Sequence, residues 1–420
     1  MSRKYLINIL TIGIAAVTLL SFAANVSAMD VKSTENFSFR VMTSTEYVET
    51  SAIAVGDING DGKNEIIVSY DEYMNDAYAN LSAYDVDGNH VSRIANLENF
   101  YVGPKEMYVD PINVFIERIN ETPYLFITGT YNENKGVYVF KYNETNKSFD
   151  VVQYFQYGTD CAILTYNKTT YLAVAGDEMY KVKNGSFVPI QDSEIVKGFI
   201  RTGHFSNDSN IAVFDGNSGA VTFYNFANES LELKQYISLN IPTPGFGNDA
   251  QDYVTGFNVG HITNSTYDEL LFVTYHNGYT VVDDSNGTPT QIVTGVLNID
   301  GDFNAMTSVT AKLYNFSTDC VVIGFDNDIY APLYEVYHYE NGTLNAVSGH
   351  GSEDGNTRVI TAGDIDGDGH DEIILGSDFD GYIRIFSETT PTPIPEISMP
   401  FLIAAIIPAF FLSLKRKHIF

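Results

Sequence analysis

The sequence predicts an all-β protein, a seven-bladed β-propeller built of four-stranded antiparallel blades. Its 420 residues include 29 Tyr and 27 Phe, and aromatic and β-branched residues favour strands. A strand–turn–strand pattern recurs seven times at a mean spacing of about 51 residues, which suits a propeller blade. Asn-Gly and Asp-Gly pairs between the strand-like runs supply the positive φ that tight hairpins need.

The first 28 residues resemble an export signal rather than part of the fold. Arg3 and Lys4 give a charged start, residues 7–22 form an apolar run, and residues 26–28 offer small side chains for cleavage. An uncleaved N-terminal membrane anchor is the alternative interpretation. In either case we expect the folded body to begin near residue 29.

The repeat predicts a body over residues 29–387. Its clearest copies are residues 54–68 and 362–375, at opposite ends of the body, and weaker copies lie between them. The turns of the copies start near residues 57, 117, 164, 204, 261, 312 and 364. The last copy has only three strands before the chain leaves the fold. We expect the strand-like segment 37–43 to supply the fourth and close the ring, because closure removes open sheet edges.

Two of the turns carry oxygen-bearing side chains at positions 1, 3, 5 and 9 of a tight loop. The first loop has Asp57, Asn59, Asp61 and Glu65, and the second has Asp364, Asp366, Asp368 and Glu372. Alternating oxygens on a loop that bends at Gly can surround one hard cation, so we predict calcium in both loops. The carbonyls of Lys63 and His370 could each add a ligand. A solvated turn without metal is the alternative.

These loops resemble the FG-GAP or VCBS repeats of integrin α-subunit-like propellers, whose pattern is D-x-[DN]-x-D-G-x-x-[DE]. The resemblance covers residues 37–387, with close matches only in the first and last blades. It implies structural calcium and a role in adhesion. A third candidate loop carries Asn298, Asp300, Asp302 and Asn304, but it precedes a blade instead of lying within one.

The other turns are rich in N-x-Ser/Thr sequons. In the turns between strands 1 and 2 of the blades they begin at Asn120, Asn167, Asn207, Asn264 and Asn315. In the turns between strands 3 and 4 they begin at Asn143, Asn146, Asn184, Asn228, Asn286 and Asn341. Both sets of turns belong to one face of an antiparallel propeller, and Asn80 is expected on the other. We expect a sugar-coated face and a bare one; the alternative is that Asn, Ser and Thr are simply common in turns.

The C-terminal end predicts a membrane anchor. A Thr- and Pro-rich linker (388–396) precedes an uncharged apolar stretch (397–414) and a basic end (415–420). Eighteen residues at about 1.5 Å each just cross a bilayer core of about 30 Å, and the basic end should stay in the cytoplasm. Pro395-Glu396-Ile397 with this span resembles the PEF-CTERM sorting tails of archaeal surface proteins. A plain anchor explains the same residues.

Charge and motifs limit the functions that remain. A net charge of −30 repels nucleic acid and attracts divalent cations. The common catalytic motifs are absent. We expect a monomeric surface module that binds an extracellular protein or glycan; the alternative is a polysaccharide lyase or hydrolase with a site at the channel mouth. Cys161 and Cys320 are expected to be separate buried thiols, in blades on opposite sides of the ring.

Overall fold

The computed structural model describes residues 32–41, 48–72, 79–87, 90–102, 114–131, 134–241, 254–297, 304–313, 316–326, 332–351, 357–377 and 380–389. Ser33–Glu388 form one compact unit. The predicted signal peptide, the apolar stretch 397–414 and the basic tail lie outside the described residues. Within the described residues, no helix combines the length and the apolar character that crossing a bilayer requires.

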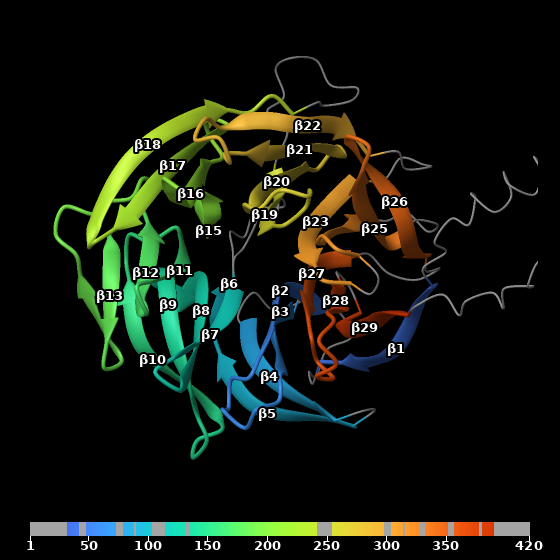
Figure 1. The fold of residues 1–420 in the computed structure, drawn as a ribbon. Coiled ribbons are helices and arrows are strands. Elements are labelled where there is room, and N and C mark those ends of the chain that lie inside the picture. Colours follow the sequence, from blue (N-terminus) through green and yellow to red (C-terminus); the bar gives the residue numbers. More distant parts are fainter. Residues whose placement is uncertain are drawn as a thin grey trace, which may run out of the picture. The chain divides into compact units, whose positions relative to one another are not determined.

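Seven antiparallel sheets arranged as a ring make up this unit, which confirms the predicted seven-bladed propeller (Figure 1). Blade 1 consists of β2 (Val48–Gly56), β3 (Glu65–Glu72), β4 (Ala79–Asp87) and β5 (His90–Glu98). Blade 2 consists of β7 (Val114–Ile119), β8 (Thr122–Tyr131), β9 (Asn134–Asn143) and β10 (Ser148–Phe155), and blade 3 of β11 (Asp160–Tyr166), β12 (Thr169–Ala175), β13 (Met179–Lys183) and β14 (Ser186–Pro189).

The remaining blades continue the order. Blade 4 has β15 (Phe199–Ser206), β16 (Ser209–Asp215), β17 (Ala220–Ala227) and β18 (Ser230–Ser238), and blade 5 has β19 (Val254–Gly260), β20 (Glu269–Thr274), β21 (Gly278–Asp283) and β22 (Thr290–Val296). Blade 6 has β23 (Asn304–Ala311), β24 (Cys320–Asp326), β25 (Pro332–Glu340) and β26 (Thr343–Gly351), and blade 7 has β27 (Thr357–Gly363), β28 (Glu372–Ser377) and β29 (Tyr382–Thr389). β1 (Lys32–Arg40) stands next to β29 in the sheet order β1-β29-β28-β27.

Blade 2 departs from the four-stranded pattern. A short strand, β6 (Phe100–Val102), pairs with the far end of β8, beyond the stretch that β7 occupies. The inner strand of this blade is therefore built from two pieces, and its sheet has five strands. The predicted pattern missed β6 because a three-residue strand carries too little periodicity to be recognised.

The hydrophobic core is divided into seven clusters, and each lies between two neighbouring blades. Leu125 and Phe140 of blade 2, for example, pack with Leu81 of blade 1, and Phe214 of blade 4 packs with Phe272 of blade 5. The cluster between blades 7 and 1 joins Ile374 and Ile385 to Ile53, so the ring of blade contacts is complete. Burying such a side chain contributes roughly 1.5–3 kcal/mol, and each blade depends on both neighbours for this burial.

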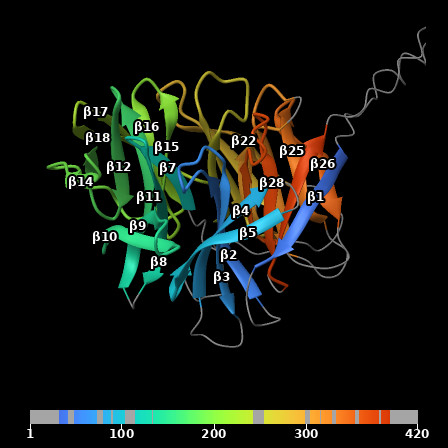
Figure 2. The same cartoon turned by 90° about the horizontal axis from the view of Figure 1, so that it is seen from below.

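The hairpin turns between strands 1 and 2 and between strands 3 and 4 lie at the same end of each antiparallel sheet. We call this end of the propeller the turn face (Figure 2). Both predicted calcium loops belong to it, because they join β2 to β3 and β27 to β28. The two cysteines lie buried in β11 and β24, in blades 3 and 6, as predicted.

Candidate metal centre

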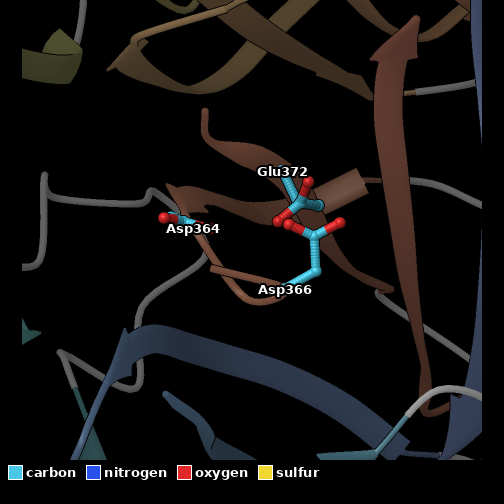
Figure 3. Close-up of side chains that lie close together, drawn as sticks. All are labelled: Asp364, Asp366 and Glu372. Atoms are coloured by element: carbon cyan, nitrogen blue, oxygen red, sulfur yellow. The ribbon is translucent and has the colours of Figure 1, made fainter. Parts of the chain in front are cut away.

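The blade 7 loop brings three acidic side chains together. One carboxylate oxygen each of Asp364, Asp366 and Glu372 lies within 4.8 Å of the others. In Figure 3 the carboxylates of Asp366 and Glu372 face each other, with Asp364 at the start of the loop. This is the one such group among the described residues, and it contains three of the four side chains that the sequence predicted for this loop.

Backbone amides hold the blade 7 loop in its shape. Asp364 accepts hydrogen bonds from the amides of Gly367 at 2.7 Å and Gly369 at 2.9 Å. Asp368 accepts one from the amide of His370 at 2.8 Å. Gly369 has a φ of +90°, which a residue with a Cβ rarely adopts. The fourth predicted side chain, Asp368, is exposed at the tip of this loop.

Blade 1 repeats the same backbone shape. Asp57 accepts hydrogen bonds from the amides of Gly60 at 2.7 Å and Gly62 at 2.9 Å, and Gly62 has a φ of +93°. Asp61 accepts from the amide of Lys63 at 2.9 Å. The acidic side chains of this loop are arranged differently from those of blade 7, however. Asp57 forms an ion pair with Arg118 of blade 2, with 3.0 Å between Nη1 and Oδ2.

The ninth residue of each loop is a buried glutamate that begins strand 2 of its blade. Glu65 accepts from the amide of Ile58 at 2.9 Å and from the side-chain amide of Asn59 at 2.9 Å, and Glu372 accepts from the amide of Ile365 at 2.8 Å. Burial, together with a smaller contribution from the neighbouring aspartates, raises the pKa of each carboxyl to about 7, although hydrogen bonds from backbone amides oppose the shift. A nearby divalent cation would stabilise the ionised form of both.

Blade 5 has the same glutamate without the other acidic ligands. Glu269 is buried and accepts from the amide of Ile262 at 3.0 Å, and Thr263 Oγ1 donates to it as well. Positions 1, 3 and 5 of this turn are His261, Thr263 and Ser265. The glutamate therefore has a structural role in the loop that does not depend on the ligand set around it.

A contact that the sequence did not reveal joins each of these loops to the blade before it. In blades 5, 6 and 7 the eighth residue of the turn is an aspartate whose carboxylate accepts a hydrogen bond from a backbone amide of the preceding blade. The pairs are Asp268 with the His204 amide at 2.6 Å, Asp319 with the His261 amide at 2.8 Å, and Asp371 with the Lys312 amide at 2.7 Å. In blade 1 the eighth residue is Asn64, whose Nδ2 donates to the carbonyl of Asp364 at 2.6 Å. The recurring acid or amide before the strand was the available signal.

The residues of both loops fit calcium. They offer carboxylate, amide and carbonyl oxygens, which are the ligands that Ca²⁺ prefers. The third candidate loop, at Asn298, Asp300 and Asp302, lies outside the described residues, apart from Asn304 at the start of β23.

A small cavity of about 150 Å³ lies among the inner strands at the centre of the ring. Arg201 of β15 and Arg358 of β27 both line it. Each guanidinium is already paired, Arg201 with Asp160 at 3.0 Å and Arg358 with Glu49 at 2.8 Å. Both cationic side chains that line the cavity are therefore neutralised by neighbouring carboxylates.

Comparison with known proteins finds a repeat-family match within blade 1. Residues 50–83 match the FG-GAP repeat. The matched FG-GAP segment runs from β2 into β4 and includes the whole first loop. The crystal structure of Chaetomium thermophilum Raptor is similar to this chain, with 13% identity and a TM-score of 0.49, over 84% of this chain and 29% of Raptor. No curated protein sequence matches this chain.

Proposed function

We propose that this chain is a calcium-binding FG-GAP propeller that acts at the cell surface as an adhesion or interaction module for an extracellular protein or glycan. The observation that carries the proposal is the cluster of Asp364, Asp366 and Glu372 in a loop whose backbone shape recurs in the FG-GAP segment. Calcium supplies a positive charge that offsets the repulsion within each loop. The protein residues hold the ion and thereby tie the first strand of a blade to the second.

The proposed ligands are the predicted ones. In blade 1 they are the side chains of Asp57, Asn59, Asp61 and Glu65 with the carbonyl of Lys63. In blade 7 they are the side chains of Asp364, Asp366, Asp368 and Glu372 with the carbonyl of His370. The two loops are neighbours across the junction of blades 7 and 1, where Asn64 contacts Asp364. Calcium there stabilises the place where the ring begins and ends.

Closure by the N-terminal strand is part of the proposal. The position of β1 beside β29 in the sheet order supports it, as do the hydrogen bonds from Arg40 Nε to the Asp380 carbonyl and from the Val41 amide to the Gly381 carbonyl, both 2.9 Å. Phe39 packs on Tyr84 of blade 1 with 5.1 Å between ring centroids. Phe39→Ala should therefore lower the unfolding free energy of the whole ring by about 3 kcal/mol. A change below 0.5 kcal/mol would argue against closure.

The surface location rests on the predicted ends of the chain. Residues 1–28 would direct export, and residues 397–414 would anchor the body with the propeller outside. Protease treatment of intact cells that express the full chain should remove the propeller and leave the anchored tail. A full-length chain that resists protease in intact cells and is cut after lysis would contradict the location.

The proposed activity is binding without cleavage. The purified full chain in detergent should retain an extracellular polysaccharide or a surface protein in a calcium-dependent manner, while the length of the polymer stays unchanged. A panel of acidic and neutral polysaccharides serves as the probe, and size-exclusion chromatography measures their length. Shortening of any of them with calcium, and not with the Asp364→Asn variant, would support the enzymatic alternative instead.

A further inference from the structure

Several asparagines of the turn face adopt left-handed backbone conformations. Asn120, Asn167, Asn184, Asn228 and Asn341 have φ between +48° and +55°. Asparagine tolerates this region better than most residues, so turn geometry alone explains its presence. It does not explain the hydroxyl residue that follows each of the five two positions later.

Left-handed asparagines elsewhere provide the comparison. Asn277, in the turn between strands 2 and 3 of blade 5, has a φ of +65°, and Asn99, between β5 and β6, has a φ of +61°. Each is followed two positions later by Tyr and not by Ser or Thr. The backbone requirement is the same at all these sites, whereas, among these left-handed asparagines, the complete sequon occurs only on the turn face.

The exposure of the sequon asparagines agrees with this division. Most of those in the described turns are exposed: Asn120, Asn167, Asn207 and Asn264 between strands 1 and 2, and Asn146, Asn184, Asn228, Asn286 and Asn341 between strands 3 and 4. Asn143 is half-buried, and its Nδ2 donates to Asp150 at 2.8 Å. Asn315 lies outside the described residues.

Asn80 corrects the sequence prediction. It was expected in an exposed turn on the opposite face, but it lies within β4 and only 9% of it is exposed. Strand β4 is in the middle of its sheet, between β3 and β5. A glycan at Asn80 would not fit the folded blade. The sequon at Asn80 is therefore not available in the native fold. The other sequon of the folded body outside the hairpin turns, at Asn36, lies within β1.

The sequons also follow a pattern around the ring. Every sequon in a hairpin turn belongs to blades 2–6, whereas blades 7 and 1 have calcium loops in the equivalent first turn. These two blades are neighbours, since β2 contacts β27. The turn face is thus divided into an arc of five blades with sequons in their hairpin turns and a sector of two blades whose hairpin turns have none.

We infer that N-linked glycans cover the turn face over blades 2–6 and leave a sugar-free sector, formed by the loops at 57–65 and 364–372, open to solvent. The inference depends on the proposed export, because Asn-X-Ser/Thr sequons act as sugar acceptors on the surface loops of secreted proteins. The sector presents the acidic loops and their cations, and the glycans restrict a large partner that approaches the turn face to this sector.

The test is a map of glycan occupancy on the full chain, expressed in a eukaryotic secretory host and purified from its surface. Peptide-N-glycosidase converts a modified Asn to Asp, and mass spectrometry of the peptides locates each conversion. We expect modification at Asn120, Asn167, Asn184, Asn228 and Asn341, at Asn146 in preference to Asn143, and none at Asn80. Thr169→Val should remove one glycan mass while Asn167 keeps its turn.

A second version of the full chain, placed behind a leader of the host, separates the two possible failures. If only this version reaches the surface and it carries the expected glycans, the export proposal fails and the glycan inference stands. If either version reaches the surface without glycans on these turns, the inference is overturned. Modification of Asn80 in the folded surface fraction would overturn it as well.

Discussion

The side-chain Nδ2 of Asn64 lies 2.6 Å from the carbonyl oxygen of Asp364, 300 residues further along the chain. This hydrogen bond joins the first blade to the last and connects the two proposed calcium loops directly. Asn64→Ala should lower the unfolding free energy by about 1 kcal/mol, the usual value of one such hydrogen bond. Urea denaturation measures the change.

A suitable control for that variant is Asn345→Ala. The Nδ2 of Asn345 donates to the carbonyl of Glu340 at 3.1 Å, within its own hairpin and in an exposed position. Its loss should cost less than the loss of Asn64. An equal effect of the two variants would show that the contact across blades 7 and 1 has no special weight.

The ion pair between Arg118 and Asp57 makes the two loops unequal. The guanidinium contacts a carboxylate that we assign to calcium, so the cation of the protein competes with the metal. Arg118→Ala should strengthen calcium binding at the blade 1 loop by about 1.4- to 5-fold, because an exposed pair is worth about 0.2–1 kcal/mol. Titration calorimetry in an Asp364→Asn background isolates this loop.

Lys181→Ala is the matched control, since Lys181 pairs with Glu229 in blades that have no proposed calcium loop. Its calcium affinity should equal that of the parent. Weaker binding in Arg118→Ala would mean that the guanidinium supports the loop rather than competing for it.

The ninth glutamate can be tested for its two roles separately. Glu269→Gln should lower the unfolding free energy by about 1–2 kcal/mol, because its buried hydrogen bonds are disturbed, and should leave the calcium stoichiometry unchanged. Glu372→Gln should lower stability similarly and also remove one bound calcium. Equilibrium dialysis with a calcium-selective electrode counts the ions. Equal stoichiometry in both variants would contradict the ligand role of Glu372.

Asp160 provides a prediction about pH. Burial raises its pKa from 3.8 to about 6, although Arg201 opposes the shift. The folded state therefore holds the proton more tightly than the unfolded chain. Its contribution to stability is complete below pH 3.8 and is lost as the pH rises through about 6. The loss corresponds to roughly 3 kcal/mol at 1.36 kcal/mol per pKa unit.

The pH dependence is measured against Asp160→Asn, which cannot ionise. The unfolding free energy of the parent minus that of Asp160→Asn should fall between pH 4 and pH 6. The control variant Glu144→Gln changes an exposed turn residue, and its unfolding free energy should show the same pH dependence as that of the parent. A difference that stays constant over this range would place the pKa of Asp160 near its ordinary value.

The sequence predicted the fold because the repeat is a property of the chain itself. The spacing of apolar residues and turn pairs predicted seven blades, and the structure has them. Candidate ligands in the two loops could be named from the sequence because their spacing reflects local geometry within nine residues. The match of the FG-GAP repeat to residues 50–83 agrees with that analysis of the first loop.

Contacts between blades could not be predicted in the same way. Arg118 and Asp57 are 61 residues apart, and nothing local shows that they meet. The burial of Asn80 was missed because its neighbours read as a turn, and only the position of β4 within its sheet shows otherwise. The short strand β6 was missed for want of periodicity. Each case depends on how separate segments come together in space.

The most direct test of the central claim is the unfolding of the full chain with calcium and with chelator. Each occupied loop should add about 2.7 kcal/mol to the unfolding free energy when free calcium is 100-fold above its dissociation constant. A variant with both Asp57→Asn and Asp364→Asn should lose the difference. Identical unfolding curves of the parent with calcium and with chelator would contradict calcium in these loops.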